Sequence, residues 1–203
     1  MARPDRSLER RQRLLPVIAK AFAERGYRRT TTAELARRAG VQETVLYRLW
    51  PDKKAMFKAA IEYVYRLSEE TWERFLLPSG PGEGGPTPAE RILAYEAGHH
   101  GEFGLYRIVF AGLSEMDDPE IRGALRRMYH RFHRFIRERI AEHHALREGG
   151  GSLPEAELCA WAVVGLGTVA NIGRELGLLG ARRRRALIER IGAFLLEGSR
   201  EAE

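Results

Sequence analysis

Four polar side chains with strong hydrogen-bonding groups lie close together in the front part of the chain, at Gln42, Thr44, Tyr47 and Arg48. The apolar residues interleaved with them in 45–50 follow a helical period, so a helix would bury one side and present the four polar groups on the other. Amide, hydroxyl and guanidinium groups are the ones that bond to base edges and phosphate oxygens. The segment therefore favours contact with nucleic acid.

Two short helices must position these side chains. Thr31 and Glu34 have the spacing of a capping box, which predicts a helix over about 32–39. Gly40 can adopt the positive φ that ends a helix, and Pro51 stops the helix that follows. Two helices joined in this way make a helix-turn-helix, whose second helix enters the major groove of DNA. A helical hairpin inside an all-α core is the alternative interpretation.

The charge of the chain is unevenly distributed. Residues 1–60 contain fifteen lysines and arginines against six acids, a net charge of +9, whereas the other 143 residues carry a net charge of −3. Because neutralisation of phosphates supplies most of the sequence-independent affinity for DNA, a basic front segment indicates a polyanionic partner there. A solvated charged face is the alternative.

Several short motifs between residues 8 and 60 together resemble a known family. They are Phe22-Ala-Glu-Arg-Gly-Tyr27, Thr30-Thr31, Leu35-Ala36, Ala39-Gly40-Val41, Leu46-Tyr47 and Pro51-Asp-Lys53-Lys-Ala-Met56. In their order and spacing they look like the N-terminal domain of the TetR family of bacterial transcriptional regulators. The resemblance implies an all-α homodimer whose basic heads bind a palindromic operator in double-stranded DNA.

The same resemblance implies a domain division and a set of DNA-contacting residues. Residues 1–52 would form a three-helix DNA-binding domain, and residues 53–203 a larger helical domain for ligand binding and dimerisation. The expected DNA-binding residues are Tyr27, Thr30, Thr31, Arg37, Gln42, Glu43, Thr44, Tyr47, Arg48 and Lys53. Binding of a small-molecule effector to the larger domain would change the spacing of the heads and release the operator, which describes a repressor.

Apolar periodicity and helix-boundary signals predict an all-α chain of about nine helices with no strand. The expected helices cover about 8–25, 32–39, 43–50, 52–77, 88–100, 103–114, 119–144, a stretch beginning after Ser152, and 181–196. Pro16 should bend the first of them. Between the fourth and fifth we expect a Gly/Pro-rich loop over 78–88.

The stretch 158–172 is almost entirely apolar, so a helix there must be covered on all sides. It is shorter than the roughly 20 residues of a membrane span, which favours a second copy of the chain as its cover. With the helix over 181–196 it would form a four-helix interface, and a buried helix in a monomer is the alternative. The expected dimer residues are Ala162, Gly165, Val169, Gly173, Leu187, Ile191 and Leu195.

Aromatic residues of the larger domain, with a few polar residues, suggest a cavity for a largely apolar or acyl-type effector. The expected pocket residues are Trp72, Phe75, Tyr95, His99, Phe103, Tyr106, Arg107, Phe110, Phe132, Trp161 and Asn171. Ordinary core packing is the alternative for each aromatic side chain. A DNA-binding regulator without any effector is the alternative for the whole chain.

A helical metal-dependent enzyme is the remaining class. Its chemistry would use His99, His100, Glu96 or Glu102, but no nucleophile elbow, phosphate loop, dinucleotide loop or paired-cysteine motif occurs. His130 and His133 have a spacing that could bind a metal ion, although neighbouring arginines would repel it. We expect no enzyme activity, no cofactor and no bound metal. The absence of a signal peptide or membrane span predicts a cytoplasmic protein without membrane contact.

Overall fold

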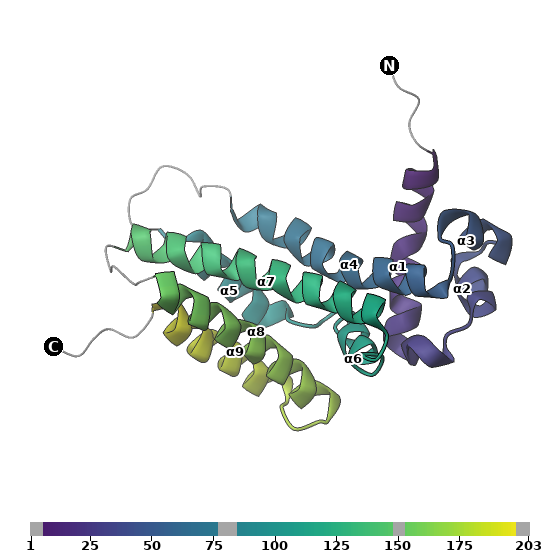
Figure 1. Cartoon of the computed structure of the whole chain (residues 1–203). Helices are drawn as coiled ribbons and strands as arrows, with labels where there is room; N and C mark the ends of the chain where they lie inside the picture. The colour runs from purple at the N-terminus through teal and green to yellow at the C-terminus, as the bar shows by residue number, and fades with distance from the viewer. Residues whose placement is uncertain (1–5, 77–84, 148–152, 198–203) are drawn as a thin grey trace, which may run out of the picture. The chain divides into compact units, whose positions relative to one another are not determined.

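The computed structural model describes residues 6–76, 85–147 and 153–197, and every regular element in these ranges is a helix (Figure 1). The elements are α1 (Arg6–Arg29), α2 (Thr32–Ala39), α3 (Glu43–Leu49), α4 (Lys53–Trp72), the 3-10 turn η1 (Glu73–Phe75), α5 (Pro88–His99), α6 (Arg107–Leu113), α7 (Pro119–Leu146), α8 (Leu153–Glu175) and α9 (Ala181–Glu197). The all-α prediction is confirmed. Residues 77–84, which hold most of the expected Gly/Pro loop, and the Ser152 cap lie outside the described ranges.

The end of α1 shows how a glycine breaks a helix. Gly26 has φ 76° and ψ 172°, a conformation that side-chain-bearing residues rarely adopt, so the regular helix stops there as the sequence predicts. The three residues after it form a separate short turn within the same element. Pro16 lies inside α1 and is exposed to solvent.

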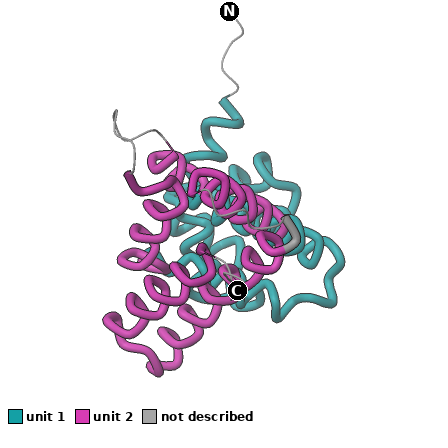
Figure 2. Tube along the Cα trace, turned by 90° about the vertical axis from the view of Figure 1, so that its left-hand side faces the viewer, with its two compact units in different colours: residues 1–68, 103–129 teal, residues 69–102, 130–203 magenta. Residues whose placement is uncertain are grey.

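The helices pack into two compact units, coloured separately in Figure 2. Unit 1 comprises residues 1–68 and 103–129, and unit 2 comprises 69–102 and 130–203. The long helices α4 and α7 contribute to both. Packing thus groups α6 and the start of α7 with α1, α2, α3 and most of α4. The predicted boundary at residue 52 concerns function, and it stays a prediction.

The core of unit 1 is formed by aromatic and aliphatic side chains. Phe22 and Phe57 are fully buried and meet edge to face, with ring centroids 4.9 Å apart. The ring of Tyr27 lies 4.9 Å from that of Phe57. Leu35 from α2 and Leu46 from α3 are also fully buried. This core fixes α2 and α3 on the body formed by α1 and α4.

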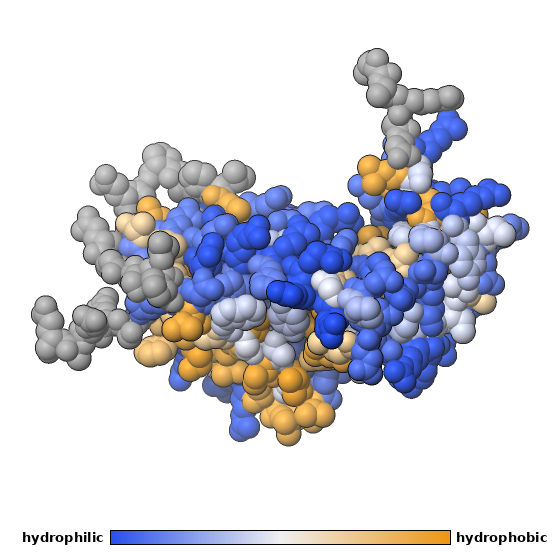
Figure 3. All heavy atoms as spheres, in the orientation of Figure 1, coloured by the Kyte–Doolittle hydropathy of each residue, from blue (hydrophilic) through white to orange (hydrophobic). Residues whose placement is uncertain are grey.

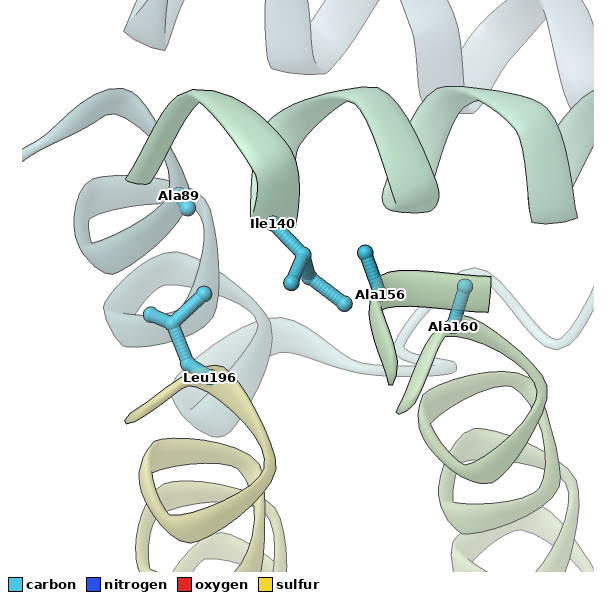
Figure 4. Close-up of a cluster of buried hydrophobic side chains, with 5 residues drawn as sticks. All are labelled: Ala89, Ile140, Ala156, Ala160 and Leu196. Atoms are coloured by element: carbon cyan, nitrogen blue, oxygen red, sulfur yellow. The ribbon is translucent and has the colours of Figure 1, made fainter. Parts of the chain in front are cut away.

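Unit 2 has a core of small and aliphatic residues. Ala89, Ile140, Ala156, Ala160 and Leu196 come from α5, α7, α8 and α9 and face one another in Figure 4. Burial of each methyl or aliphatic side chain stabilises the fold by roughly 25 cal/mol per Å² of apolar surface removed from water. The small alanines let the four helices approach closely.

The N-terminus of α5 carries a capping box that supports this core. The Thr87 hydroxyl accepts a hydrogen bond from the Glu90 amide at 3.3 Å, and a Glu90 carboxylate oxygen accepts one from the Thr87 amide at 2.6 Å. Thr87 Oγ1 also lies 2.9 Å from Nδ1 of the buried His143. The cap therefore links α5 to α7.

The helix α8 (Leu153–Glu175) begins where the sequence predicts and extends beyond the apolar run 158–172. It has 23 residues, and the stretch Glu155–Glu175 is long and apolar enough to cross a membrane by length and composition alone. Core helices of soluble proteins pass the same test. The length of α8 therefore does not by itself distinguish a membrane span from a core helix.

Candidate nucleic-acid interface

The turn between α2 and α3 has the geometry of a helix-turn-helix. The Thr31 hydroxyl caps α2 by accepting a hydrogen bond from the Glu34 amide at 3.2 Å. Gly40 ends α2 in the left-handed conformation, with φ 64° and ψ 34°. The Val41 amide then donates to the Ala36 carbonyl at 3.0 Å, which closes the turn. These contacts set the angle at which α3 leaves the domain.

The side of α3 that faces away from the core is polar. Leu46 and Leu49 are buried, so the rotation of the helix about its axis is fixed. The exposed residues at this surface, which we call the α3 face, are Gln42, Glu43, Thr44, Tyr47 and Arg48.

Tyr47 is the largest side chain of the α3 face. It is 47% exposed, and its hydroxyl lies 3.1 Å from Oγ1 of Thr32, to which it donates a hydrogen bond. The bond orients the ring along the surface between α2 and α3. An oriented aromatic side chain with an accessible edge is suited to contact with a thymine methyl group or a sugar.

Three residues expected to contact DNA serve the domain itself. Thr30 is fully buried, and its hydroxyl donates to the Gly26 carbonyl at 2.6 Å, so its assignment to DNA binding is corrected. The Lys53 ammonium donates to the Tyr27 carbonyl at 3.1 Å and lies 4.4 Å from the centre of the Tyr27 ring. Burial raises the pKa of Tyr27, which keeps its hydroxyl neutral. Lys53 and Tyr27 thus brace the junction between α1 and α4.

The acid Glu34 neutralises much of the basic surface of α2. Its carboxylate accepts hydrogen bonds from Arg37 at 2.9 Å and from Arg38 at 2.6 Å. These bonds and the two guanidinium charges lower the pKa of Glu34 to about 2. Arg38 also pairs with Glu24 of α1. Arg37 is exposed but is already paired, so its expected role at DNA would require exchange of one acidic partner for another.

Acids from outside the first sixty residues neutralise further cations of unit 1. Arg28 pairs with Glu115 at 2.8 Å. Lys54 pairs with Asp118 at 2.7 Å and with Glu120 at 3.1 Å, which raises the pKa of Lys54 and lowers that of Asp118. The hydrogen bonds from Lys58 and Lys54 lower the pKa of Glu120. The net charge of +9 counted along the sequence therefore overstates the positive charge that unit 1 presents.

Comparison with known proteins identifies this domain. Residues 14–60 match the model described as "Bacterial regulatory proteins, tetR family". Residues 14–60 therefore form a domain of the TetR family. Among characterised relatives, the nucleoid occlusion factor SlmA of Haemophilus influenzae is 49% identical over 57 residues, which are 28% of this chain and 26% of that protein. SlmA of Serratia proteamaculans is 28% identical over 167 residues, 74% of this chain and 75% of that protein.

Solved structures of TetR-family proteins share the fold over nearly the whole chain. The regulator from Cytophaga hutchinsonii has a TM-score of 0.74 at 15% identity, with 96% of both chains covered. The regulator PfmR from Thermus thermophilus has a TM-score of 0.64 at 18% identity, with 95% of this chain and 98% of that chain covered. At these identities the likeness extends to the fold alone. The match to the first H. influenzae relative spans about a quarter of its length.

The expected effector residues divide between the two units. In unit 2, Trp72 is buried between Phe135, at a centroid distance of 4.9 Å, and Phe132, at 5.8 Å. Phe75 lies 5.0 Å from Tyr95, which in turn stacks on His99 at 4.4 Å. The members that lie in unit 1 are Phe103, Tyr106, Arg107 and Phe110.

Four of the expected pocket residues are exposed: His99, Phe103, Arg107 and Trp161. Phe103 is 64% exposed and Trp161 is 42% exposed. The Trp161 ring stacks on the buried ring of His133 at 4.4 Å and lies on the outer side of α8. His133 Nε2 is 3.1 Å from the Glu157 carbonyl, so α7 and α8 use this histidine in packing. In the described ranges, no group of three or more His, Cys, Asp or Glu residues could hold a metal ion.

A polar network centred on His100 was not predicted from the sequence. Its Nδ1 lies 2.7 Å from a Glu96 carboxylate oxygen, and its Nε2 lies 3.0 Å from the Gly167 carbonyl. The Glu96 and Gly167 oxygens are acceptors, which suits donation from both ring nitrogens, whereas the Asn171 amide nitrogen near Nε2 is a donor and suits a neutral ring. The Trp72 indole donates to the second oxygen of Glu96 at 2.7 Å, and the Asn171 amide lies 3.1 Å from Nε2. The network ties α4 and α5 to α8.

The pKa of His100 reflects two opposing effects. Burial lowers it, but the hydrogen bond and charge of Glu96 and the Gly167 carbonyl outweigh burial and the charge of Arg174, so the pKa is raised above 6.5. The i, i+4 spacing of Glu96 and His100 was a visible signal for the pair. Its connection to Gly167 required the fold.

The expected dimer residues occupy different environments in unit 2. Ala162, Gly165 and Val169 lie on the exposed side of α8, and Ile191 is 44% exposed on α9. Gly173 is buried, and a Cβ added to it would lie 2.6 Å from the Leu179 side chain of the same chain. The remaining two are half-buried: Leu187 and Leu195.

Exposed apolar side chains extend the surface formed by Ala162, Gly165 and Val169. The α8 face, as we call it, comprises the exposed residues Leu158, Trp161, Ala162, Gly165, Val169, Ile172 and Leu176. Phe194 of α9 is 65% exposed. Hydrophobic surface gathers over α8 and α9 in Figure 3.

Proposed function

We propose that the chain is a ligand-responsive transcriptional repressor that binds a palindromic operator as a homodimer in the cytoplasm. The observation that carries the proposal is the α3 face, an exposed polar surface on the second helix of a helix-turn-helix. Gln42, Thr44 and Arg48 supply amide, hydroxyl and guanidinium groups for base edges and phosphates. The two heads of a dimer would read half-sites one helical turn apart, about 34 Å.

The proposed second subunit packs on the α8 face. An exposed apolar stripe of this length is costly in water, because each buried aliphatic or aromatic side chain contributes roughly 1.5–3 kcal/mol. Pairing of two α8 and two α9 helices would bury the stripe from both chains in an isologous interface. The alternative cover for so apolar a helix is a lipid bilayer, and the sedimentation experiment described in the Discussion distinguishes the two.

The proposed effector is small and largely apolar or acyl-type. Unit 2 supplies the aromatic surface for it, through Trp72, Phe75 and Tyr95. A structural neighbour from Saccharomonospora viridis, with a TM-score of 0.69 at 18% identity, was solved in complex with choline, covering 95% of this chain and all of that one. A ligand can release the operator only by binding better to a dimer whose heads have the wrong spacing.

A selection of genomic fragments by the purified protein tests DNA binding. We expect enrichment of short inverted repeats. Arg48→Gln should weaken binding to the enriched fragments, whereas the matched control Arg122→Gln, at an exposed arginine of α7, should not. Failure of the parent protein to enrich any duplex in modest salt would overturn the proposal.

A thermal-shift survey of small molecules tests the effector. A ligand present at 100 times its Kd should raise the free energy of unfolding by about 2.7 kcal/mol. The same ligand should release bound operator. If no ligand in a broad apolar and acyl panel stabilises the protein, the alternative of an effector-independent DNA-binding regulator replaces this part of the proposal.

A further inference from the structure

The first two turns of α1 form a helical projection from unit 1. Residues 6–13, which we call the α1 extension, precede Leu14, the first buried residue of the helix at 4% exposure. Every residue of the extension except Ser7 is exposed. In Figures 1 and 2 these turns stand out from the rest of unit 1, on the same body as α2 and α3.

The α1 extension concentrates positive charge. It contains Arg6, Arg10, Arg11 and Arg13 against the single acid Glu9. Across residues 6–76, 85–147 and 153–197, no ion pair joins any of these four arginines to a carboxylate. Several basic residues deeper in unit 1 differ, because Arg28, Arg37, Arg38, Lys54 and Lys58 have acidic partners. Much of the unpaired charge of the domain is therefore gathered at the start of α1.

Three of the arginines form one stripe. At 100° per residue, Arg6, Arg10 and Arg13 lie within about 60° of one another around the helix, and Arg11 points elsewhere. The exposed Lys20 continues the stripe farther along α1. The stripe from residue 6 to 13 is about 10 Å long, a length over which one DNA strand carries about three phosphates.

This charge pattern opposes the stability of its own helix. Arginines at i, i+3 and i, i+4 repel each other, and positive charge near a helix N-terminus is unfavourable to the macrodipole. No packing offsets these effects, because the side chains of the extension are exposed. A polyanion laid along the stripe would relieve both kinds of repulsion.

We infer that Arg6, Arg10 and Arg13 bind the phosphate backbone of duplex DNA outside the half-site contacted by α3. The inference rests on the proposed function, since it takes the same DNA as its partner. The contact is electrostatic and carries no sequence information, so it strengthens binding to every duplex. It adds a second anchoring surface to the DNA-binding head.

The test compares salt dependence of binding to a fluorescent random-sequence duplex of about three helical turns. The variant is R6Q/R10Q/R13Q, in which glutamine keeps helix propensity and removes charge. The matched control is R182Q/R183Q/R190Q, which removes the same charge from exposed arginines of α9. For the first variant the slope of log K against log salt concentration should fall in magnitude by about 2.7 for each bound subunit, and for the control by less than about one.

A charge-preserving variant separates contact from folding. R6K/R10K/R13K should keep the parent slope, because lysine also neutralises a phosphate. If both triple variants lose slope equally, the extension acts through its structure and the phosphate contact is overturned. An unchanged slope in R6Q/R10Q/R13Q also overturns it while leaving the proposed function intact. If the parent protein itself binds no duplex, the proposed function fails instead.

Discussion

The α3 face and the α8 face are both exposed sides of helices whose opposite sides are buried, but they differ in chemistry. The α3 face presents amide, hydroxyl, carboxylate and guanidinium groups around Tyr47. The α8 face presents aliphatic and aromatic groups, including Leu158 at 71% and Val169 at 54% exposure. A polar, partly charged surface is suited to a hydrated, salt-dependent partner, whereas an apolar one is suited to a dry and salt-insensitive partner.

The largest expected effect comes from a charge on the α8 face. Val169→Glu would place a carboxylate in the proposed dimer interface, where burial of a polar group without partners costs roughly 2–7 kcal/mol and burial of a charge costs more. Sedimentation should show single chains at concentrations at which the parent is a dimer. Leu113→Glu, at an exposed leucine of α6, is the control and should leave the dimer intact. A Val169→Glu protein that sediments as a dimer would place the interface elsewhere.

A smaller effect is expected from the centre of the α3 face. Tyr47→Ala should weaken operator binding by about 1–3 kcal/mol through loss of base or sugar contact. Tyr47→Phe removes only the hydroxyl that bonds to Thr32 and should retain most of the affinity. Fluorescence anisotropy on an enriched fragment measures both, with Phe103→Ala as a control at another exposed aromatic residue. Equal affinity of the Tyr47→Ala and parent proteins would contradict a role for this face.

Arg48 and Arg37 are both exposed, but they should contribute differently to the salt dependence of DNA binding, because Arg37 is paired with an acid. Arg48→Gln should reduce the magnitude of the salt slope by about one for each bound subunit, because it removes one phosphate-neutralising charge per chain. Arg37→Gln should reduce it less, since Glu34 already holds the Arg37 guanidinium. Titrations at several salt concentrations measure both slopes. Equal slopes for the two variants would mean that Glu34 releases Arg37 at DNA.

The smallest expected effect is the dependence of the stability of unit 2 on pH. The pKa of His100 is raised in the folded chain, so its stabilising contribution is complete below about 6.5 and is lost as pH rises through the folded pKa. Burial lowers the pKa of His143, so its contribution is instead lost as pH falls through the ordinary value. Thermal unfolding should therefore give a stability maximum between the two transitions.

The substitution Glu96→Gln tests the contribution of His100 to the dependence of stability on pH. It removes the carboxylate that favours the imidazolium, so the decline at high pH should weaken while the decline at low pH stays. Operator binding at fixed pH provides a control for the α3 face, which the substitution does not touch. An unchanged decline at high pH in Glu96→Gln would assign that transition to another group.

The sequence by itself determined the helices and the polar side of α3. Gly26, Gly40 and Pro51 impose local backbone constraints, and apolar periodicity identifies which side of each helix is buried, so both could be predicted without tertiary contacts. The same local reasoning indicated the exposed apolar run of α8. The start predicted after Ser152 agrees with the observed start of α8 at Leu153, and the helix extends beyond the apolar run.

Only the tertiary structure decided which cations are unpaired and which polar residues are buried. Glu115, Asp118 and Glu120 neutralise basic residues that lie more than sixty positions away along the chain, and no count within the first sixty residues includes them. Thr30 becomes a buried hydrogen-bond donor by the same kind of packing. Helix formation depends on neighbours along the chain, so the helices could be predicted from the sequence. Ion pairing and burial depend on distances between segments that are remote in sequence, so they required the tertiary structure.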